Sequence, residues 1–139
     1  GQTFELTELI DMFPSLCELA GIPAPDYLQG ESFVPLLENP GREWKTAAFS
    51  QFHRRPKVTP DGKRYMGYSI RTKEYHYVEW YYWDHKKGER LDYVTSELYD
   101  IKNDPDENKN IAADKEMESV VKKLSKQLED GWRAARPQK

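Results

Sequence analysis

The chain has 139 residues, of which 32% are charged and 37% hydrophobic, so it has room for one ordinary domain with a modest core. Its formal net charge of −3 argues against a general nucleic-acid binder. No apolar run approaches the roughly 20 residues that a membrane-spanning helix needs.

The first segment, residues 6–20, carries apolar residues three and four positions apart, which predicts a helix with one broad apolar face. Pro14 has no backbone N–H to donate, so it belongs in the first turn, with Asp11 as the N-cap. Gly21 is expected to end the helix in a left-handed conformation. We expect so broad an apolar face to need a covering surface from beyond this chain.

Residues 22–43 are rich in proline, which indicates an irregular connector with a short helical turn near 33–37. From Trp44 the pattern changes to strands, predicted at 46–52, 65–72, 75–83 and 97–100. The second and third of these are expected to form a hairpin around Lys73-Glu74. Pro60-Asp61-Gly62 predicts a separate turn.

The last segment has the clearest pattern. Apolar residues recur at three and four positions from Met117 to Trp132, which predicts an amphipathic helix that begins near Asp114 and ends before Pro137. Residues 44–139 are therefore predicted to form an α+β unit, in which an antiparallel sheet of about four strands carries this helix on one face.

No catalytic or metal-binding motif emerges from the residues. The three histidines, His53, His76 and His85, lie at spacings that match no metal site. The turn that begins at Asp104 resembles the start of a calcium loop, but its sixth position is Lys109, where such a loop needs glycine. There is no Gly-rich phosphate loop and no evident acid–base pair of carboxylates. We therefore predict no catalytic residue and no metal ligand in this chain.

A basic stretch from His53 to Lys57 directly follows a predicted strand, so its side chains would be presented at an edge of the sheet. Arg54 is suited to paired hydrogen bonds with sulfate, phosphate or carboxylate, and a solvated loop is the alternative interpretation. Arg71, on the polar face of the hairpin, has the same chemistry, or it pairs with an acidic residue or with backbone carbonyls.

Three stretches, taken in chain order, resemble type I sulfatases. Leu9–Ile22 is similar to the family's Asp-x-x-Pro-Thr-Leu helix that ends in Leu-Ala-Gly, with Ser15 in place of threonine. Gly30–Leu37 resembles the family's Gly-x-Ser-Leu-x-Pro-Leu-Leu. Glu97–Ala112 looks like its closing Glu-Leu-Tyr-Asp-Leu and Asp-Pro-x-Glu motifs. Within the family, Met66–Thr72 is most similar to the iduronate-2-sulfatase branch.

The resemblance implies a C-terminal subdomain at 44–139, preceded at 1–43 by the final helix and connector of an alkaline-phosphatase-like α/β catalytic domain. Type I sulfatases hydrolyse sulfate esters with a formylglycine made from a Cys/Ser-x-Pro-x-Arg motif. Cys17 is followed by Glu18 and does not match that motif. The resemblance therefore implies that the formylglycine and the calcium belong to a missing N-terminal catalytic domain, and that this chain is inactive alone.

As part of a whole enzyme, the chain would shape one wall of a cleft for sulfated glycosaminoglycan sugars. The residues expected to contact the substrate are His53, Arg54 and Arg71. The resemblance also implies a periplasmic, extracellular or lysosomal location, although no signal peptide is visible in this chain. Two alternatives stay open, a stand-alone module that binds anionic saccharides and a structural partner of another chain.

Overall fold

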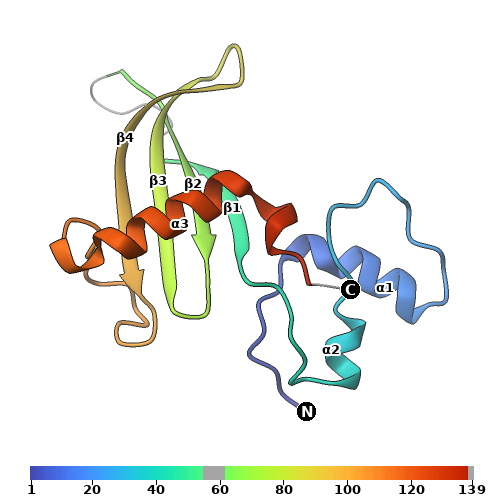
Figure 1. Cartoon of the computed structure of the whole chain (residues 1–139). Coiled ribbons are helices and arrows are strands. Elements are labelled where there is room, and N and C mark those ends of the chain that lie inside the picture. Colours follow the sequence, from blue (N-terminus) through green and yellow to red (C-terminus); the bar gives the residue numbers. More distant parts are fainter. Residues whose placement is uncertain (55–61, 138–139) are drawn as a thin grey trace.

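The computed structural model describes residues 1–54 and 62–137. Helices and a connector form the N-terminal part, and a four-stranded sheet crossed by a helix forms the rest (Figure 1). The helical elements are η1 (Leu9–Asp11), α1 (Met12–Leu19), α2 (Val34–Glu38), η2 (Lys115–Met117), α3 (Glu118–Asp130) and η3 (Trp132–Ala135). The strands are β1 (Ala48–His53), β2 (Tyr65–Arg71), β3 (Tyr75–Asp84) and β4 (Glu89–Asp100).

The sheet is antiparallel throughout and has the order β1-β2-β3-β4, so every strand pairs with its neighbours in sequence. This confirms the predicted α+β class and the β2–β3 hairpin. One boundary was predicted wrongly, because β4 begins at Glu89, well before the expected start at Glu97. Two register shifts between β3 and β4 interrupt the alternation from which a strand is recognised.

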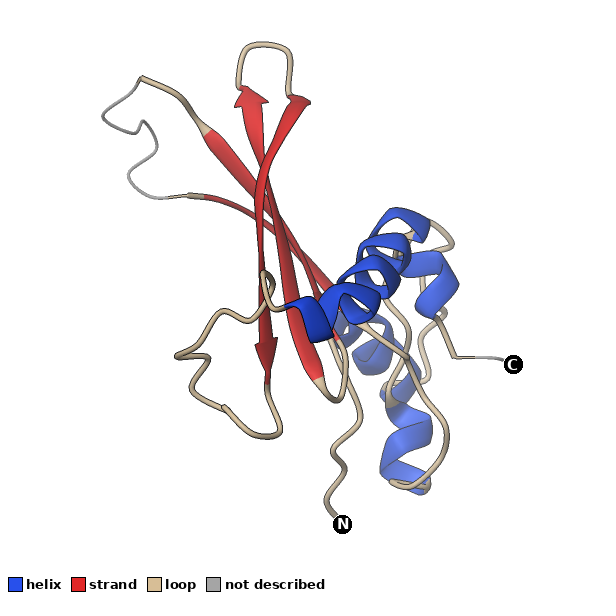
Figure 2. Cartoon of the chain, turned by 60° about the vertical axis from the view of Figure 1, so that its left-hand side comes forward, coloured by secondary structure: helices blue, strands red, loops and turns tan. Residues whose placement is uncertain are grey.

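The core lies between α3 and one face of the sheet. Ile70, Tyr77 and Leu98 point from three adjacent strands towards Leu124 of α3, and all four are buried. In Figure 2 all the helices lie to one side of the strands. The predicted packing of the amphipathic helix on the sheet is therefore confirmed, and hydrophobic burial along this layer is the main stabilising contribution.

Both long helices end at glycines with positive φ. Gly21 has φ of 66°, and the N–H of Ile22 donates to the carbonyl of Cys17, as in a Schellman motif. Gly131, with φ of 78°, ends α3 at Asp130. The predicted helix was therefore slightly too long, because Trp132 lies in the separate short helix η3.

The apolar face of α1 is largely uncovered. Leu9 of η1 is 86% exposed, and Phe13, Leu16 and Leu19 of α1 are each more than half exposed. Nothing in the described residues covers these side chains, as the spacing of the segment led us to expect.

Two sequence features fall outside the described residues. They are Arg55 to Lys57 of the basic stretch and most of the predicted turn at Pro60-Asp61-Gly62. Within the described ranges, no helix has the length and apolar character that crossing a bilayer requires.

Candidate functional site

His53 and Arg54 lie where β1 ends, at the end of the sheet away from α1 (Figure 1). Both are exposed, as predicted from their position after a strand. Successive residues of a strand point to opposite faces. His53 makes an edge-to-face contact with Trp83, with ring centres 5.9 Å apart, and its pairing with Met66 places it on the face that also carries α3. Arg54 therefore lies on the opposite face of the sheet, which no helix covers in Figure 2 and which we call the open face.

On the open face, Arg54 stacks on a well-held tryptophan. Its guanidinium carbon lies 5.6 Å from the centre of the Trp80 ring. Trp80 is fixed by its indole N–H, which donates to Glu97 at 2.9 Å, and by an edge-to-face contact with Phe52. Gly67 leaves the room that this ring occupies. A guanidinium stacked in this way keeps its N–H groups free at the rim, where they can bind an anion in paired fashion.

Arg71 lies far from His53 and Arg54. In the β1–β2 ladder Arg71 faces Ala48, five residues from His53 at the other end of β1, a separation of about 17 Å. The Arg71 guanidinium contacts the Glu107 carboxylate at 3.0 Å, and His76 Nδ1 lies 2.8 Å from the other oxygen of the same carboxylate. The structure therefore does not bring the three predicted residues together. It pairs Arg71 with an acidic residue, which was the alternative interpretation.

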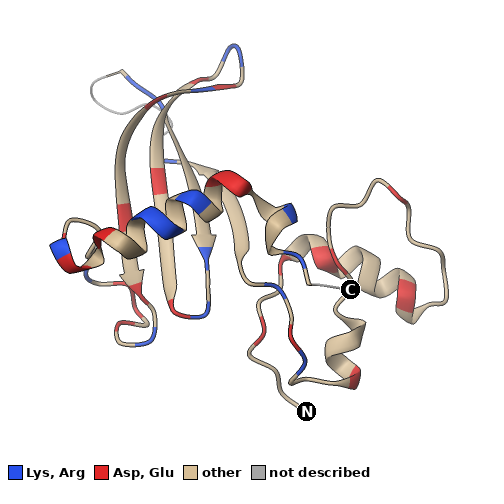
Figure 3. Cartoon of the chain, in the orientation of Figure 1, with Lys and Arg blue, Asp and Glu red and all other residues tan. Residues whose placement is uncertain are grey.

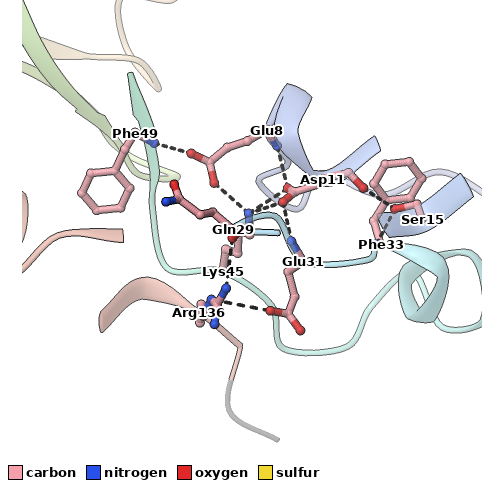
Figure 4. A network of polar contacts seen from close by, with 9 residues as sticks. All are labelled: Glu8, Asp11, Ser15, Gln29, Glu31, Phe33, Lys45, Phe49 and Arg136. Carbon is pink, nitrogen blue, oxygen red and sulfur yellow. Dashed lines mark hydrogen bonds and ion pairs between the residues drawn. The ribbon is translucent and has the colours of Figure 1, made fainter. Parts of the chain in front are cut away.

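A buried ionic cluster, which sequence reasoning missed, joins the N-terminal part to the sheet (Figure 4). Lys45 Nζ lies 2.7 Å from Glu8 Oε2 and from each carboxylate oxygen of Asp11. Lys45 is 5% exposed and Asp11 is fully buried. The other Glu8 oxygen accepts a hydrogen bond from the backbone N–H of Phe49 in β1.

The remaining acceptor capacity of Asp11 organises the chain around α1. Its carboxylate accepts hydrogen bonds from the backbone N–H groups of Glu8 and Glu31, each at 2.8 Å. Its carbonyl accepts from the Ser15 hydroxyl, which in turn accepts from the N–H of Phe33. Asp11 does stand at the N-cap position of α1, but its side chain does not cap that helix. These contacts cross the boundary that we predicted between residues 43 and 44.

A second cluster surrounds the buried Glu79 of β3. Its carboxylate accepts hydrogen bonds from the hydroxyls of Tyr77 and Tyr81. Burial, together with the negative charge of Glu79, raises the pKa of Tyr81 to about 12 and raises that of Tyr77 as well. Both phenols therefore stay protonated donors at neutral pH. The alternation of aromatic residues on β3 was visible in the sequence, but the pairing with Glu79 was not.

The described residues offer no candidate metal site. No three His, Cys, Asp or Glu side chains among them are grouped to hold a metal ion, so a calcium ion would not fit here. In the turn that resembles a calcium loop, the Asp104 carboxylate accepts hydrogen bonds from Asn108 and from the backbone of Lys109. The backbone N–H groups of Lys109 and Asn108 lower the pKa of Asp104. The carboxylate therefore stabilises its own turn.

Comparison with known proteins decides the family. The model of the N-sulphoglucosamine sulphohydrolase C-terminal family matches residues 1–134. The chain belongs to this family. This sulfatase C-terminal region is 32% identical over 87% of its length to an N-acetylglucosamine-6-O-sulfatase of Bacteroides thetaiotaomicron, of which it covers 20%. It is also 28% identical over 88% of its length to the mouse iduronate 2-sulfatase, of which it covers 28%.

A solved structure agrees. The chain superposes with a TM-score of 0.65 and 30% sequence identity on the structure of BT4656 in complex with its substrate D-glucosamine-2-N,6-O-disulfate. The superposition covers 88% of this chain and 23% of the BT4656 chain. The chain thus spans only about a fifth to a quarter of the length of the N-acetylglucosamine-6-O-sulfatase and of BT4656. The predicted family is confirmed, whereas a special closeness to iduronate-2-sulfatase is not, because several sulfatases match comparably.

Proposed function

We propose that this chain is the C-terminal portion of a sulfuric ester hydrolase that acts on sulfated glycosaminoglycan sugars. In this proposal it supports the fold and one wall of the substrate cleft, and it supplies no nucleophile. The observation that carries the proposal is the family match over residues 1–134. The formylglycine and the calcium ion would then belong to a part of the protein outside this chain.

The proposed partner is the sulfatase catalytic domain, which would cover the apolar face of α1. That face exposes Leu9, Phe13, Leu16 and Leu19 and carries no Lys or Arg among these positions, so its burial against an apolar surface would be favourable. The buried cluster around Lys45 would then transmit the position of α1 to β1, and so hold the end of β1 in a fixed place relative to the catalytic domain.

The proposed substrate contacts are His53 and Arg54. Arg54 is exposed, is held against Trp80, and has the planar geometry that sulfate and carboxylate groups match. Arg71 is left out of this surface for two reasons. It lies about 17 Å from His53 along the strand, and its guanidinium is paired with Glu107. By the likeness of Met66–Thr72, a 2-O-sulfated uronate is the substrate that we propose to test first. The family resemblance also supports a periplasmic, extracellular or lysosomal location.

The first test is direct. The coding sequence upstream of Gly1 should contain, in frame, a Cys/Ser-x-Pro-x-Arg motif, and the protein that it encodes should release sulfate from a sulfated disaccharide. The 139-residue chain alone should release none. Sulfate release by the isolated chain, or a complete protein that lacks the motif and the activity, would contradict the proposal.

The second test concerns the substrate contacts. In the complete protein, Arg54→Gln is expected to raise KM for a 2-O-sulfated uronate disaccharide several-fold with little change in kcat, because Arg54 would bind and position but not react. Arg133→Gln is the matched control. Arg133 also stacks on an aromatic ring, at 4.4 Å from the centre of the Trp132 ring, but it lies in η3, after the C-terminal end of α3. Equal kinetics of both variants would exclude Arg54 from the cleft.

A further inference from the structure

The far ends of β3 and β4 carry a group of aromatic and basic side chains that the proposed function does not use. The Tyr81 ring contacts Tyr68 on one side and Tyr93 on the other, with centres 5.8 and 5.7 Å apart and rings nearly perpendicular. The guanidinium of Arg90 lies over the Tyr81 ring at 4.5 Å and over the Tyr68 ring at 5.7 Å. We call Tyr68, Tyr81, Arg90 and Tyr93 the tyrosine platform.

Two irregularities of the sheet assemble the tyrosine platform. The β3–β4 register changes between the pairs Trp80–Thr95 and Tyr81–Tyr93, and again before the pair Trp83–Arg90. Each change inserts one extra residue into β4. In a regular ladder, Tyr93 and Arg90 would not both stand opposite residues of the Tyr81 face. The first insertion turns Tyr93 onto the face that already carries Tyr68 and Tyr81, and the second reverses the alternation again, so that Arg90 also lies on that face; β-bulges re-aim side chains in this way near binding sites.

The tyrosine platform lies beside α3 but is not covered by it. Helix α3 packs over the part of this face that holds Ile70, Tyr77 and Leu98, and the distal strands extend past it (Figure 1). Tyr93 is 53% exposed, and Arg90 is exposed and makes no ion pair within the residues that the structure describes. The Tyr81 hydroxyl donates a hydrogen bond to the carboxylate of Glu79, which fixes the position of the ring. The rings are thus fixed in place while one surface stays open.

The charge around the tyrosine platform differs in sign from that of the whole chain. At this end of the sheet, residues 53–54, 62–65 and 83–93 contain six Lys or Arg and three Asp or Glu, whereas the whole chain has a net charge of −3 (Figure 3). The cations are Arg54, Lys63, Arg64, Lys86, Lys87 and Arg90, and the anions are Asp84, Glu89 and Asp92. A local excess of cations attracts anionic ligands.

We propose that the tyrosine platform binds a sulfated sugar unit, with the sugar packed on Tyr93 and a sulfate group on Arg90. A tyrosine offers a rigid apolar ring with a polar hydroxyl, which suits the alternating C–H and O–H surface of a sugar. A stacked arginine offers paired donors for sulfate. The choice of a sulfated saccharide rests on the proposed function. The inference deepens that function, because it extends the site from His53 across β2 to β4.

A saccharide fits this surface better than a protein partner does. The face of α1 exposes apolar side chains without charge, as expected for a surface buried against another domain, whereas the tyrosine platform exposes a phenol and a guanidinium. His53 and Tyr81 both pair with Met66, one from each side of β2, so their Cα atoms lie about 10 Å apart on one face. A saccharide longer than one sugar would therefore reach both.

Binding to the 139-residue chain tests the inference. A size-defined heparin oligosaccharide is titrated calorimetrically into the parent chain and into Arg90→Gln, Tyr93→Ala and Tyr93→Trp. Arg90→Gln and Tyr93→Ala should each bind about tenfold more weakly, the first through loss of one charge-assisted contact and the second through loss of the ring on which the sugar packs. Tyr93→Trp keeps an aromatic surface and should retain binding. Arg133→Gln, which removes a stacked arginine elsewhere, is the matched control and should bind as the parent chain does.

Three outcomes would overturn the inference: equal binding by Arg90→Gln and Arg133→Gln, equal binding of the chemically desulfated oligosaccharide, or no binding by a folded parent chain. Near-ultraviolet circular dichroism checks that each variant keeps its tyrosine packing. Failure of the proposed function is a separate result, because it is measured as sulfate release by the complete protein. Suppose that the complete protein hydrolyses a small sulfate ester, but that Arg90→Gln leaves oligosaccharide binding by the 139-residue chain unchanged. This combination would refute only the binding role of the tyrosine platform.

Discussion

The substitution Lys45→Met tests whether the buried cluster stabilises the chain. Methionine has nearly the length of lysine but no charge, so the change removes three contacts of 2.7 Å to Glu8 and Asp11 and leaves the packing volume nearly intact. Asp11 is fully buried, and the two carboxylates would then face each other without a cation. Breaking one side of a buried ion pair costs about 3–5 kcal/mol of unfolding free energy.

The control is Lys122→Met on the outer face of α3. Lys122 contacts Glu118 at the same distance of 2.7 Å, but the two side chains are 74% and 69% exposed. Water screens such a pair, so its loss should leave the unfolding free energy nearly unchanged. The two substitutions therefore make the same chemical change at the same distance and differ in burial.

Urea unfolding at pH 7, followed by circular dichroism and by tryptophan fluorescence, measures the difference. With a denaturant slope of about 2 kcal/mol per molar urea, the Lys45→Met midpoint should fall by about 2 M and the Lys122→Met midpoint should stay nearly unchanged. Trp44, buried next to Lys45 in the chain, reports the same region by fluorescence. Midpoints that agree within error would refute the reasoning, because burial would then not decide the strength of the pair.

Three further predictions concern the sheet. Gly67→Ala should cost about 1–3 kcal/mol in urea unfolding, because its Cβ would lie 2.9 Å from the Trp80 ring, whereas Gly41→Ala, with nothing nearer than 4.0 Å, should be nearly neutral. Burial and a neighbouring carboxylate raise the pKa of Tyr81 from 10.0 to about 12, so the folded chain keeps a proton that the unfolded chain loses. Stability should therefore fall as pH rises between these values, and Tyr81→Phe should make the fall shallower in urea titrations at successive pH values. Arg71→Gln should lower the unfolding free energy by at most about 1 kcal/mol, since its ion pair is half exposed, and a larger loss would contradict a surface role for that pair.

Local patterns in the sequence determined the layers of this protein. The spacing of Met117, Val121, Leu124 and Leu128 predicts a helix with one apolar face, and Gly21 predicts the end of α1, because both depend on residues within a few positions of one another. The hairpin of β2 and β3 follows in the same way from alternation around a short turn. Three ordered motifs likewise sufficed for the sulfatase family, which the match over residues 1–134 confirms.

The candidate site was only partly visible in the sequence. His53 and Arg54 were placed correctly at the end of a strand, because a basic stretch that directly follows a strand is presented at its end. That Arg71 is far from them and paired with Glu107 was not predictable, because the pair joins residues separated by a strand, a loop and the sheet register. Their roles in binding stay predictions.

Tertiary structure alone decided the contacts over long sequence separations. Lys45 meets Asp11 across 34 positions, and no local pattern specifies which lysine neutralises which buried carboxylate. The tyrosine platform depends on two single-residue insertions in the β4 ladder, and each reverses the face to which the following side chains point. A sequence encodes alternation directly, but register emerges only when strands pair, so the sequence determined the family and the layers, and the fold decided which charged and aromatic residues share a surface.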